Sequence, residues 1–480
     1  MKIRFLTLFL ILTSFLWAEK TVTISNLRPR TDMNGEVVDA HDGRISQFNG
    51  VYYWYGTAYG NTSGFKSSNY YQCYSSTDLT HWKKEGTLLK NAPQGIYYRP
   101  HVVYNPKTKQ YVLWYNWYAQ LWEGKFGVAV ASRPTGPFKI VNSNVTVFNS
   151  ANGVGDFGLF VDDDSVAYLV YNTINGHRGS VEKLKPDYLS STLENGGFLT
   201  ENCEAGAMFK RNGIYYLLTD HNCCFCTQGS GARVFMSTHP MTDYVEHNNI
   251  NRLPGSPAPM LVDGVLSPNL HTVVKKHPDG SFTPIQIEFQ GDSVLNTIKI
   301  IQFTGNRKTI CGDTSDASAN EPIRAPSFEV MYWKNGYWIP LRITEKAMSS
   351  SVYTLLDLRF EPIKTRRLKV LTNKNYPYDL MINEIEVSEN NRLLSSGAQA
   401  YLLDLNVAKC MPQIPGQQTY VMPLETVDGI RYIWMADLWG SASDNIKGHD
   451  YQYWSAPLEF DPKGDIEPMK WVDVWKVKLP

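Results

Sequence analysis

Short apolar segments come in pairs along this chain, and a few polar or turn-forming residues join the members of each pair. In residues 201–220, ENCEAGAMFKRNGIYYLLTD, the dipeptide Asn212-Gly213 separates two such segments, and Glu204 stands just ahead of the first. Asn-Gly between apolar runs is a strong hairpin signal, because both central residues of a type I′ turn need positive φ. The pattern therefore predicts an antiparallel hairpin at this place.

The same hairpin pattern recurs in four other places, with turns predicted at Asn49-Gly50, Lys107-Thr108, Asp164-Ser165 and Asp428-Gly429. The first four turns of the chain follow one another at intervals of about fifty residues, a repeat length typical of β-propeller blades. The interval before the last turn is several times longer. The repeats therefore predict an all-β fold, a five-bladed β-propeller with a segment inserted between its fourth and fifth blades.

The segment 266–398 has a different pattern, in which the strands alternate between apolar and polar residues. Such strands are predicted at 285–289, 297–301, 328–332, 367–371 and 382–387. Regularly spaced strands with one apolar face indicate a β-sandwich, here a jelly roll, and surface loops accept such insertions at a modest closure cost. The predicted order is a signal peptide (1–18), blades one to four (19–265), the inserted β-sandwich (266–398), and the fifth blade with the closure of the ring (399–480).

One residue stands about eight positions before each predicted turn, at the start of the first strand of its unit. These residues are Asp42, Arg99, Asp156, Glu204 and Tyr420. In a propeller the first strands line the central channel, so these positions should meet at one mouth of it. We therefore expect three carboxyl groups, on Asp42, Asp156 and Glu204, to converge from three different blades.

The first residues have the pattern of a secretory signal peptide. Lys2 and Arg4 give a positive start, Phe5–Phe15 gives an apolar core, and Ala18 is a small residue at which cleavage could occur. A membrane anchor is the less favoured interpretation, because this run is shorter than the roughly 20 apolar residues that span a bilayer. No other stretch is apolar enough to span a membrane, so the sequence predicts a soluble, exported protein.

Charge and composition narrow the range of partners. The numbers of Lys+Arg and of Asp+Glu are equal, at 46 each, which argues against nucleic acid or an acidic membrane surface as a binding partner. Aromatic residues make up 13% of the chain, and they suit both the packing of strands and stacking on sugar rings. The acidic run 162–164 resembles a calcium-binding run, but a single acidic turn is more typical of the hairpin itself. No redox or organic cofactor is predicted, and no specific motif in the sequence supports a structural calcium ion.

The chain has seven cysteines, and an odd number leaves at least one outside any intramolecular disulfide. In an oxidising compartment some of them should pair. The cluster 223–226, CCFC, follows the Glu204 hairpin and Cys203 directly precedes Glu204, so we expect a disulfide that braces this rim. A zinc site is less favoured, because no second ligand pair has zinc-finger spacing. Two N-glycosylation sequons, at Asn61 and Asn144, fit surface loops.

The hairpin motifs resemble those of glycoside hydrolase family 43, a family of five-bladed propellers. The resemblance rests on 41–45, HDGRI, in the first blade, 156–164, DFGLFVDDD, in the third, and 204–210, EAGAMFK, in the fourth. Segment 76–82, STDLTHW, resembles the family's outer-strand motif. The fifth blade looks most like that of the exo-β-1,3-galactanase branch. The insert resembles discoidin-like, galactose-binding-like domains, which could bind glycans.

The resemblance implies hydrolysis of a glycosidic bond with inversion at the anomeric carbon. Glu204 would be the general acid, Asp42 the general base that activates water, and Asp156 the residue that orients the acid and tunes its pKa. An inverting enzyme needs its two carboxyl groups roughly 6.5–9.5 Å apart, so that a water molecule fits beside the sugar. The acid must stay protonated near neutral pH, which burial and a neighbouring carboxylate can achieve.

The chain departs from the galactanase branch in its first two blades. Asp42 stands where that branch typically has glycine, and Tyr98 precedes the Arg-Pro pair where that branch tends to have glutamate. The resemblance also implies that a glutamine of the last blade could assist the water, and Gln417 and Gln418 are present there. Arg99, Gln417 and Gln418 are the predicted substrate-binding residues, although Arg99 could instead pair with a catalytic carboxylate. Either Asp42 or a glutamine could activate the water.

The sequence thus predicts a secreted, inverting glycosidase that acts from chain ends on β-1,3-galactan or related galactosides. Two alternatives stay open. An arabinofuranosidase or xylosidase would use the same three carboxyl groups. A non-catalytic carbohydrate-binding or adhesion protein would reuse both domains, but it would not need all three carboxyl groups at equivalent positions.

Overall fold

The chain forms two compact units. The computed structural model describes residues 20–227, 229–251, 255–267, 270–303, 328–334, 337–372, 379–403 and 412–480. The predicted signal peptide, 1–18, lies outside these residues, as do Cys311 and Cys410. The first unit consists of Met1–Asn251, Pro412–Glu459 and Met469–Pro480, and the second consists of Arg252–Met411 and Phe460–Pro468.

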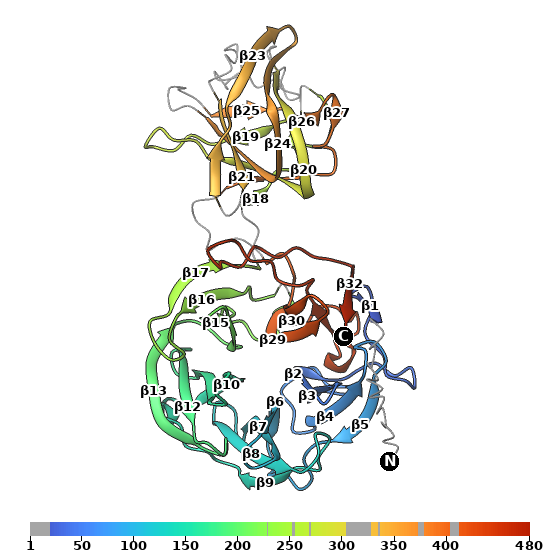
Figure 1. Cartoon of the computed structure of the whole chain (residues 1–480), viewed down its shortest axis with the longest axis vertical. Coiled ribbons are helices and arrows are strands. Elements are labelled where there is room, and N and C mark those ends of the chain that lie inside the picture. The colour runs from blue at the N-terminus through green and yellow to red at the C-terminus, as the bar shows by residue number, and fades with distance from the viewer. Residues whose placement is uncertain are drawn as a thin grey trace, which may run out of the picture. The chain divides into compact units, whose positions relative to one another are not determined.

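The first unit is a five-bladed β-propeller, as the hairpin repeats predict (Figure 1). Its first blade contains β2 (His41–Phe48), β3 (Val51–Ala58), β4 (Tyr70–Ser76) and β5 (Lys83–Thr87). The second contains β6 (Ile96–Asn105), β7 (Gln110–Tyr118), β8 (Gly124–Ala131) and β9 (Lys139–Asn142). The third contains β10 (Val154–Val161), β11 (Ala167–Thr173), β12 (Gly179–Leu184) and β13 (Ser191–Thr200). The fourth contains β14 (Ala207–Arg211), β15 (Ile214–Thr219), β16 (Arg233–Ser237) and β17 (Val245–Asn249), and the fifth contains β29 (Gln417–Thr426), β30 (Gly429–Leu438) and β31 (Tyr451–Trp454).

The first strands of the blades lie beside one another around the ring. Their order is β2, β6, β10, β14 and β29, and β29 lies beside β2 again. Two further strands, β1 (Lys20–Ser25) and β32 (Val474–Leu479), pair antiparallel. The Asn26 side chain, just after β1, donates to the Trp454 carbonyl at 2.9 Å and accepts from the Trp454 amide at 3.1 Å. Both ends of the described propeller chain therefore pack against the fifth blade and close the ring.

The predicted type I′ turns are present between the paired strands. Asn49 and Gly50 have φ of 51° and 79°, and Asn212 and Gly213 have the same pair of values. Large aromatic residues pack between the blades, where Trp54 lies 5.3 Å from both Trp82 and Trp454, measured between ring centroids. The high aromatic content is thus used largely in the core of the propeller.

The first strands of four blades carry irregularities close to the predicted site residues. The pairing register shifts between His41 and Arg44 in β2, Tyr98 and His101 in β6, Val154 and Phe157 in β10, and Gln418 and Tyr420 in β29. The first three shifts enclose Asp42, Arg99 and Asp156, and a bulge of this kind re-aims a side chain away from the regular sheet. Asp42 and Arg99 accordingly have φ of 59° and 49°. Tyr420, expected at the same mouth, is instead buried in the core.

The second unit is also built from β-strands. One nine-stranded sheet contains β18 (Ser256–Pro257), β20 (Ile285–Phe303), β21 (Phe328–Lys334), β22 (Tyr337–Pro340), β23 (Ile343–Ser350), β24 (Tyr353–Thr372), β26 (Glu384–Glu389), β27 (Arg392–Leu393) and β28 (Gln399–Leu402). A smaller sheet pairs β19 (Thr272–Val274) with β25 (Leu380–Ile382). The predicted strands 285–289 and 297–301 are two parts of the single strand β20, whose register against β24 shifts between Glu288 and Ser293. Ile287, Ile298 and Leu368 belong to a core of this unit's own.

Helical structure is confined to short turns in the described part of the chain. These 3₁₀ turns are η1 (Ser150–Asn152), η2 (Pro259–Leu261) and η5 (Lys447–His449). Within the described ranges, no helix has the length and apolar character needed to cross a membrane.

Candidate active site

A pocket of the propeller brings together five of the six predicted site residues. Its polar lining includes Asp42, Arg99, Asp156, Glu204 and Gln417. Its apolar walls are formed mainly by aromatic side chains, namely Phe65, Tyr98, Tyr118, Trp122 and Phe225. A pocket with aromatic walls and a few convergent polar groups is the usual form of a small-molecule site. The convergence that was expected from strand register is therefore present in the structure.

Asp42 is held from its side chain and from its main chain. Tyr59 donates its hydroxyl to the Asp42 carboxylate at 2.5 Å, and the Asp42 amide donates to Asp437 at 2.8 Å. Burial and the charge of Asp437 raise the pKa of Asp42 above its usual value of 3.8, although Arg99 and the Tyr59 hydrogen bond oppose this. Asp42 is thus a fixed carboxyl group with increased basicity.

A buried histidine lies behind Asp42. Nδ1 of His41 is 3.1 Å from Oδ1 of Asp437, and both side chains are almost fully buried. Burial lowers the pKa of His41, but the charges of Asp437, Asp39 and Asp42 outweigh it and raise that pKa to about 9. The imidazole is therefore charged at neutral pH, and it balances the negative charge of Asp437 next to the pocket.

Glu204 lies in surroundings that favour its protonated form. Its amide donates to Asp220 at 2.8 Å, which fixes the main chain just ahead of β14. Only 12% of its side chain is exposed. Burial, together with the charges of Asp156 and Asp220, raises the pKa of Glu204 well above its usual value of 4.5, against the opposing charge of Arg99. Glu204 can therefore hold a proton at neutral pH.

Asp156 connects the second blade to the residue after Glu204. Its carboxylate lies 2.9 Å from the guanidinium of Arg99 and accepts a hydrogen bond from the Ala205 amide at 3.3 Å. Arg99 is only 2% exposed and also donates to the main-chain carbonyls of Thr419 and Gln418, at 3.4 and 3.5 Å. Since a buried guanidinium needs partners of this kind, Arg99 is a link between three blades as well as part of the pocket lining.

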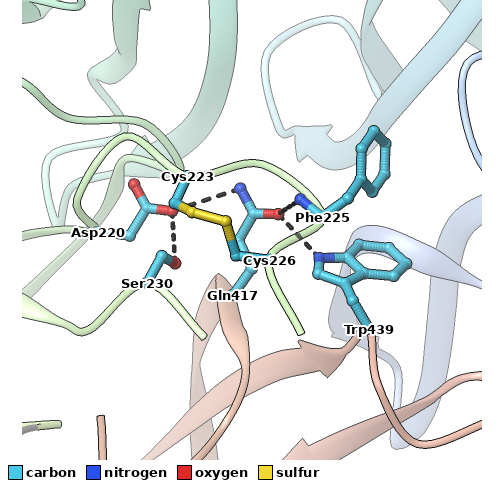
Figure 2. The surroundings of a disulfide bond; sticks show 7 residues. All are labelled: Asp220, Cys223, Phe225, Cys226, Ser230, Gln417 and Trp439. Atoms are coloured by element: carbon cyan, nitrogen blue, oxygen red, sulfur yellow. Dashed lines mark hydrogen bonds between the residues drawn. A yellow bond between two sulfur atoms is a disulfide. The ribbon is translucent and has the colours of Figure 1, made fainter. Parts of the chain in front are cut away.

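Gln417 is hydrogen bonded at both ends of its amide, as Figure 2 shows. Its nitrogen donates to Asp220 at 3.3 Å, while its oxygen accepts from the Trp439 indole at 2.8 Å and the Phe225 amide at 3.2 Å. Phe225 lies in the loop closed by the predicted disulfide of this rim, which joins Cys223 to Cys226. Gln417 thus ties the fifth blade to the disulfide loop that forms one wall of the pocket.

Gln418 is the predicted site residue that does not line the pocket. Its side chain is fully buried, with its amide nitrogen donating to the Ala205 carbonyl at 2.7 Å. Its amide oxygen accepts from the Trp434 indole at 2.9 Å. Both ends of this side chain are therefore occupied inside the protein, next to the main chain that follows Glu204.

Several residues of the site were not identified from the sequence. Asp220 directly follows β15 and Asp437 is the next-to-last residue of β30, and each accepts the amide of a predicted acidic site residue. Each lies seven or eight residues after the glycine of the preceding turn, and this similar spacing was a usable signal. Tyr59 and Phe225 lie in loops that follow the second strands of blades one and four, and no local pattern predicts where such loops go.

Within the described ranges, no three or more His, Cys, Asp or Glu side chains are arranged so that they could hold a metal ion. The acidic run at the β10–β11 turn is occupied by protein partners. Asp162 lies 2.8 Å from the Lys210 ammonium and accepts the Tyr215 hydroxyl at 2.6 Å, and Asp163 lies 3.1 Å from the same ammonium. These contacts give the acidic residues a role in joining blades three and four.

Comparisons with known proteins agree with this architecture. Residues 38–275 match the model of a family described as glycosyl hydrolases family 43. Among solved structures, two described as GH43 β-1,3-galactosidases have TM-scores of 0.53 and 0.54 at 20% and 19% identity. They cover 95% and 94% of this chain, and 64% and 99% of their own; the second was solved with galactodeoxynojirimycin. An exo-β-1,3-galactanase from Clostridium thermocellum has a TM-score of 0.53 at 17% identity, over 94% of this chain and 66% of its own.

At these identities the structural likeness shows the fold alone. The chain spans about two thirds of the length of the first β-1,3-galactosidase and of the Clostridium galactanase. No curated protein matches it significantly in sequence. The family match covers blades one to four, and with them Asp42, Asp156 and Glu204. The family match spans just under half of the chain and, together with the five-bladed propeller, it supports a glycosidase of glycosyl hydrolase family 43.

Proposed function

We propose that this protein hydrolyses glycosidic bonds with inversion, acting from chain ends on β-1,3-linked galactan or related galactosides. The observation that carries the proposal is the pair of carboxyl groups, Asp42 and Glu204, that line one pocket from different blades. Their surroundings raise both pKa values, and the shift is larger for the glutamate. Two titratable groups in one site with separated pKa values are the usual basis for assigning acid and base.

The proposed roles follow from the proton that each group can hold. Glu204 gives its proton to the glycosidic oxygen as the bond to the anomeric carbon breaks. Asp42 takes a proton from the water that attacks the opposite face of the sugar. Asp156 holds the Ala205 amide and the Arg99 guanidinium, so it acts as a positioning residue, and its charge favours protonated Glu204.

The proposed substrate rests on the fifth blade and on the galactanase-type neighbours in structure. One observation favours a second candidate within the family. Asp42 is a carboxylate where the galactanase branch typically has glycine, which favours an arabinofuranosidase or xylosidase. The three activities share the acid and base but differ in the sugar that the pocket accepts.

The test is to incubate the protein with β-1,3-galactan and with aryl galactosides, arabinofuranosides and xylosides, and to follow the products by NMR. Release of single galactose units whose first-formed anomer is inverted would support the proposal in full. Release of arabinose or xylose with inversion would change the proposed substrate but support the proposed mechanism. A retained anomer would contradict the assignment of Asp42 as base, and no release from any substrate would favour a non-catalytic binding protein.

The pH dependence of kcat/KM is expected to be bell-shaped, with its maximum near neutral pH or above. Asp42 must be ionised, and its raised pKa moves the acidic limb above the usual range of aspartate. Glu204 must be protonated, and its raised pKa moves the basic limb in the same direction. Measured profiles would contradict the assignment if activity were already lost above about pH 6, where an ordinary carboxyl pair is fully ionised.

We also propose that the second unit binds glycans. A pocket of this unit is lined by Trp333, Lys364, Arg366, Asp292 and Glu467, among others, and it offers an aromatic face with charged groups of both signs. In affinity electrophoresis of the full chain, Trp333→Ala should weaken retention in a polysaccharide gel and leave aryl glycoside hydrolysis unchanged. Equal retention of both proteins would refute this site.

Export from the cell is part of the same proposal. The Cys223–Cys226 disulfide supports it, because disulfides persist mainly in oxidising compartments. Exposed Asn61 and Asn144 are compatible with glycosylation in a host that modifies these sequons.

A further inference from the structure

Tyr98 carries a buried hydroxyl group for which the described protein supplies no hydrogen-bond partner. The residue is the third of β6 and directly precedes Arg99. Only 7% of it is exposed, and it lines the same pocket as Asp42, Asp156 and Glu204. A buried hydroxyl without a partner costs about 1–3 kcal/mol, so an unsatisfied one in a native structure needs an explanation.

The ring of Tyr98 is fixed by other aromatic rings. Tyr59, Phe65, Tyr118 and Phe225 lie around it, with ring centroids 6.1, 5.7, 5.9 and 6.4 Å away. Rings packed in this way leave the phenol little freedom to turn toward another partner. The position of the hydroxyl is therefore set by the packing of the pocket wall.

The neighbouring tyrosine Tyr71 shows the opposite arrangement. It is almost fully buried, and its hydroxyl lies 2.8 Å from both the Tyr98 carbonyl and the Asn116 carbonyl. Tyr71 does not line the pocket. Of these two buried tyrosines, one thus has its hydroxyl satisfied by the protein and the other does not.

Burial and the charged groups around the pocket keep the Tyr98 hydroxyl neutral. Burial and the charges of Asp42 and Asp156 raise its pKa, as do the neighbouring groups of Tyr118 and Cys224. A neutral phenol can both donate and accept a hydrogen bond. Sugar hydroxyl groups have the same dual capacity, and a sugar ring entering the pocket would bring several of them to this wall.

We propose that the Tyr98 hydroxyl binds a hydroxyl group of the sugar in the pocket and helps to select it. The inference rests on the proposed glycosidase function. A site built to hydrogen bond a substrate hydroxyl disfavours analogues that lack it, because the protein group is then left buried without a partner. Tyr98 is therefore a determinant of which sugar is hydrolysed.

The test compares Tyr98→Phe with Tyr71→Phe in the full chain, by thermal unfolding and by kcat/KM. Tyr98→Phe should leave the unfolding temperature unchanged or raise it, because it removes an unsatisfied hydroxyl, while kcat/KM falls about tenfold. Tyr71→Phe should lower the unfolding temperature by a few degrees, because it removes the one buried hydroxyl that donates to these carbonyl groups. This difference in stability can be measured whether or not the protein is an enzyme.

A series of aryl glycosides, each lacking one hydroxyl of the accepted sugar, identifies the contact. For one of them, wild type and Tyr98→Phe should be hydrolysed at the same rate, because the bond is already absent. The proposal is overturned if Tyr98→Phe keeps wild-type kcat/KM, or if it unfolds several degrees lower.

If wild type hydrolyses nothing, the glycosidase proposal fails by itself. Ligand-observed NMR then tests whether Tyr98 still contributes to the binding of free galactose, arabinose or xylose. Equal binding by wild type and Tyr98→Phe would refute its role.

Discussion

Replacing Glu204 by glutamine should lower the hydrolysis of glycosides with poor leaving groups by about 10³-fold, within the range seen for general acids. Glutamine has nearly the same shape but no acidic proton to give. The fold should be preserved, because the Asp220 contact is made by the main-chain amide. Steady-state kinetics on the substrate identified by the NMR panel measures the effect.

The dependence on the leaving group distinguishes this role from a structural one. A dinitrophenyl glycoside needs little protonation to depart, so Glu204→Gln should hydrolyse it at a rate close to that of wild type. Glu182 offers a matched control, because it is a fully buried glutamate of the third blade outside the pocket lining. Glu182→Gln should alter stability and show no leaving-group dependence. Equal losses of Glu204→Gln on both substrates would contradict the acid role.

The pH dependence of stability tests the raised pKa of Glu204 independently of activity. The native pKa of Glu204 is raised, so above its unfolded value the native state binds more protons than the unfolded state. Its burial therefore destabilises the fold increasingly as pH rises from about 4.5 toward the native pKa. Glutamine removes this penalty, and at pH 8 the variant should unfold at the same or a higher temperature than wild type.

The parts of this structure that the sequence predicted are those encoded locally. Asn49-Gly50 and Asn212-Gly213 specify their turns through backbone preference, so the hairpins and their spacing could be identified without any long-range information. Counting back from each turn then assigns Asp42, Asp156 and Glu204 to equivalent places in three blades. Propeller geometry, rather than any local signal, brings these places into one pocket.

The parts that were not predicted depend on contacts between distant segments. Gln418 was expected at the substrate, but it is one strand position from Gln417 and bonds Ala205 and Trp434 instead. Neighbouring residues on a strand point to opposite faces, and the sequence did not show which glutamine would face the pocket. The contact of Tyr59 with Asp42 likewise depends on how the loop after β3 folds back.

The residue that activates the water can be identified by comparing Asp42→Asn with Gln417→Leu. Asp42→Asn should lose about 10³-fold in kcat, because asparagine cannot accept the proton that the water gives up. Tyr59 and the main-chain contact to Asp437 can hold asparagine in the same place. Gln417 already uses both ends of its amide on Asp220, Trp439 and Phe225, so Gln417→Leu should cost about tenfold through loss of positioning.

Azide separates loss of the base from loss of positioning, because this anion attacks the anomeric carbon without giving up a proton. With Asp42→Asn and an aryl glycoside, added azide should restore turnover and yield a glycosyl azide of inverted configuration. Gln417→Leu should show no such rescue, because its base is intact. The reverse result, with azide rescuing Gln417→Leu alone, would move the activation of water to the fifth blade. Asp42 would then be a residue that orients Tyr59 and balances Arg99, since the pKa shifts of Asp42 and Arg99 show that their charges act on each other.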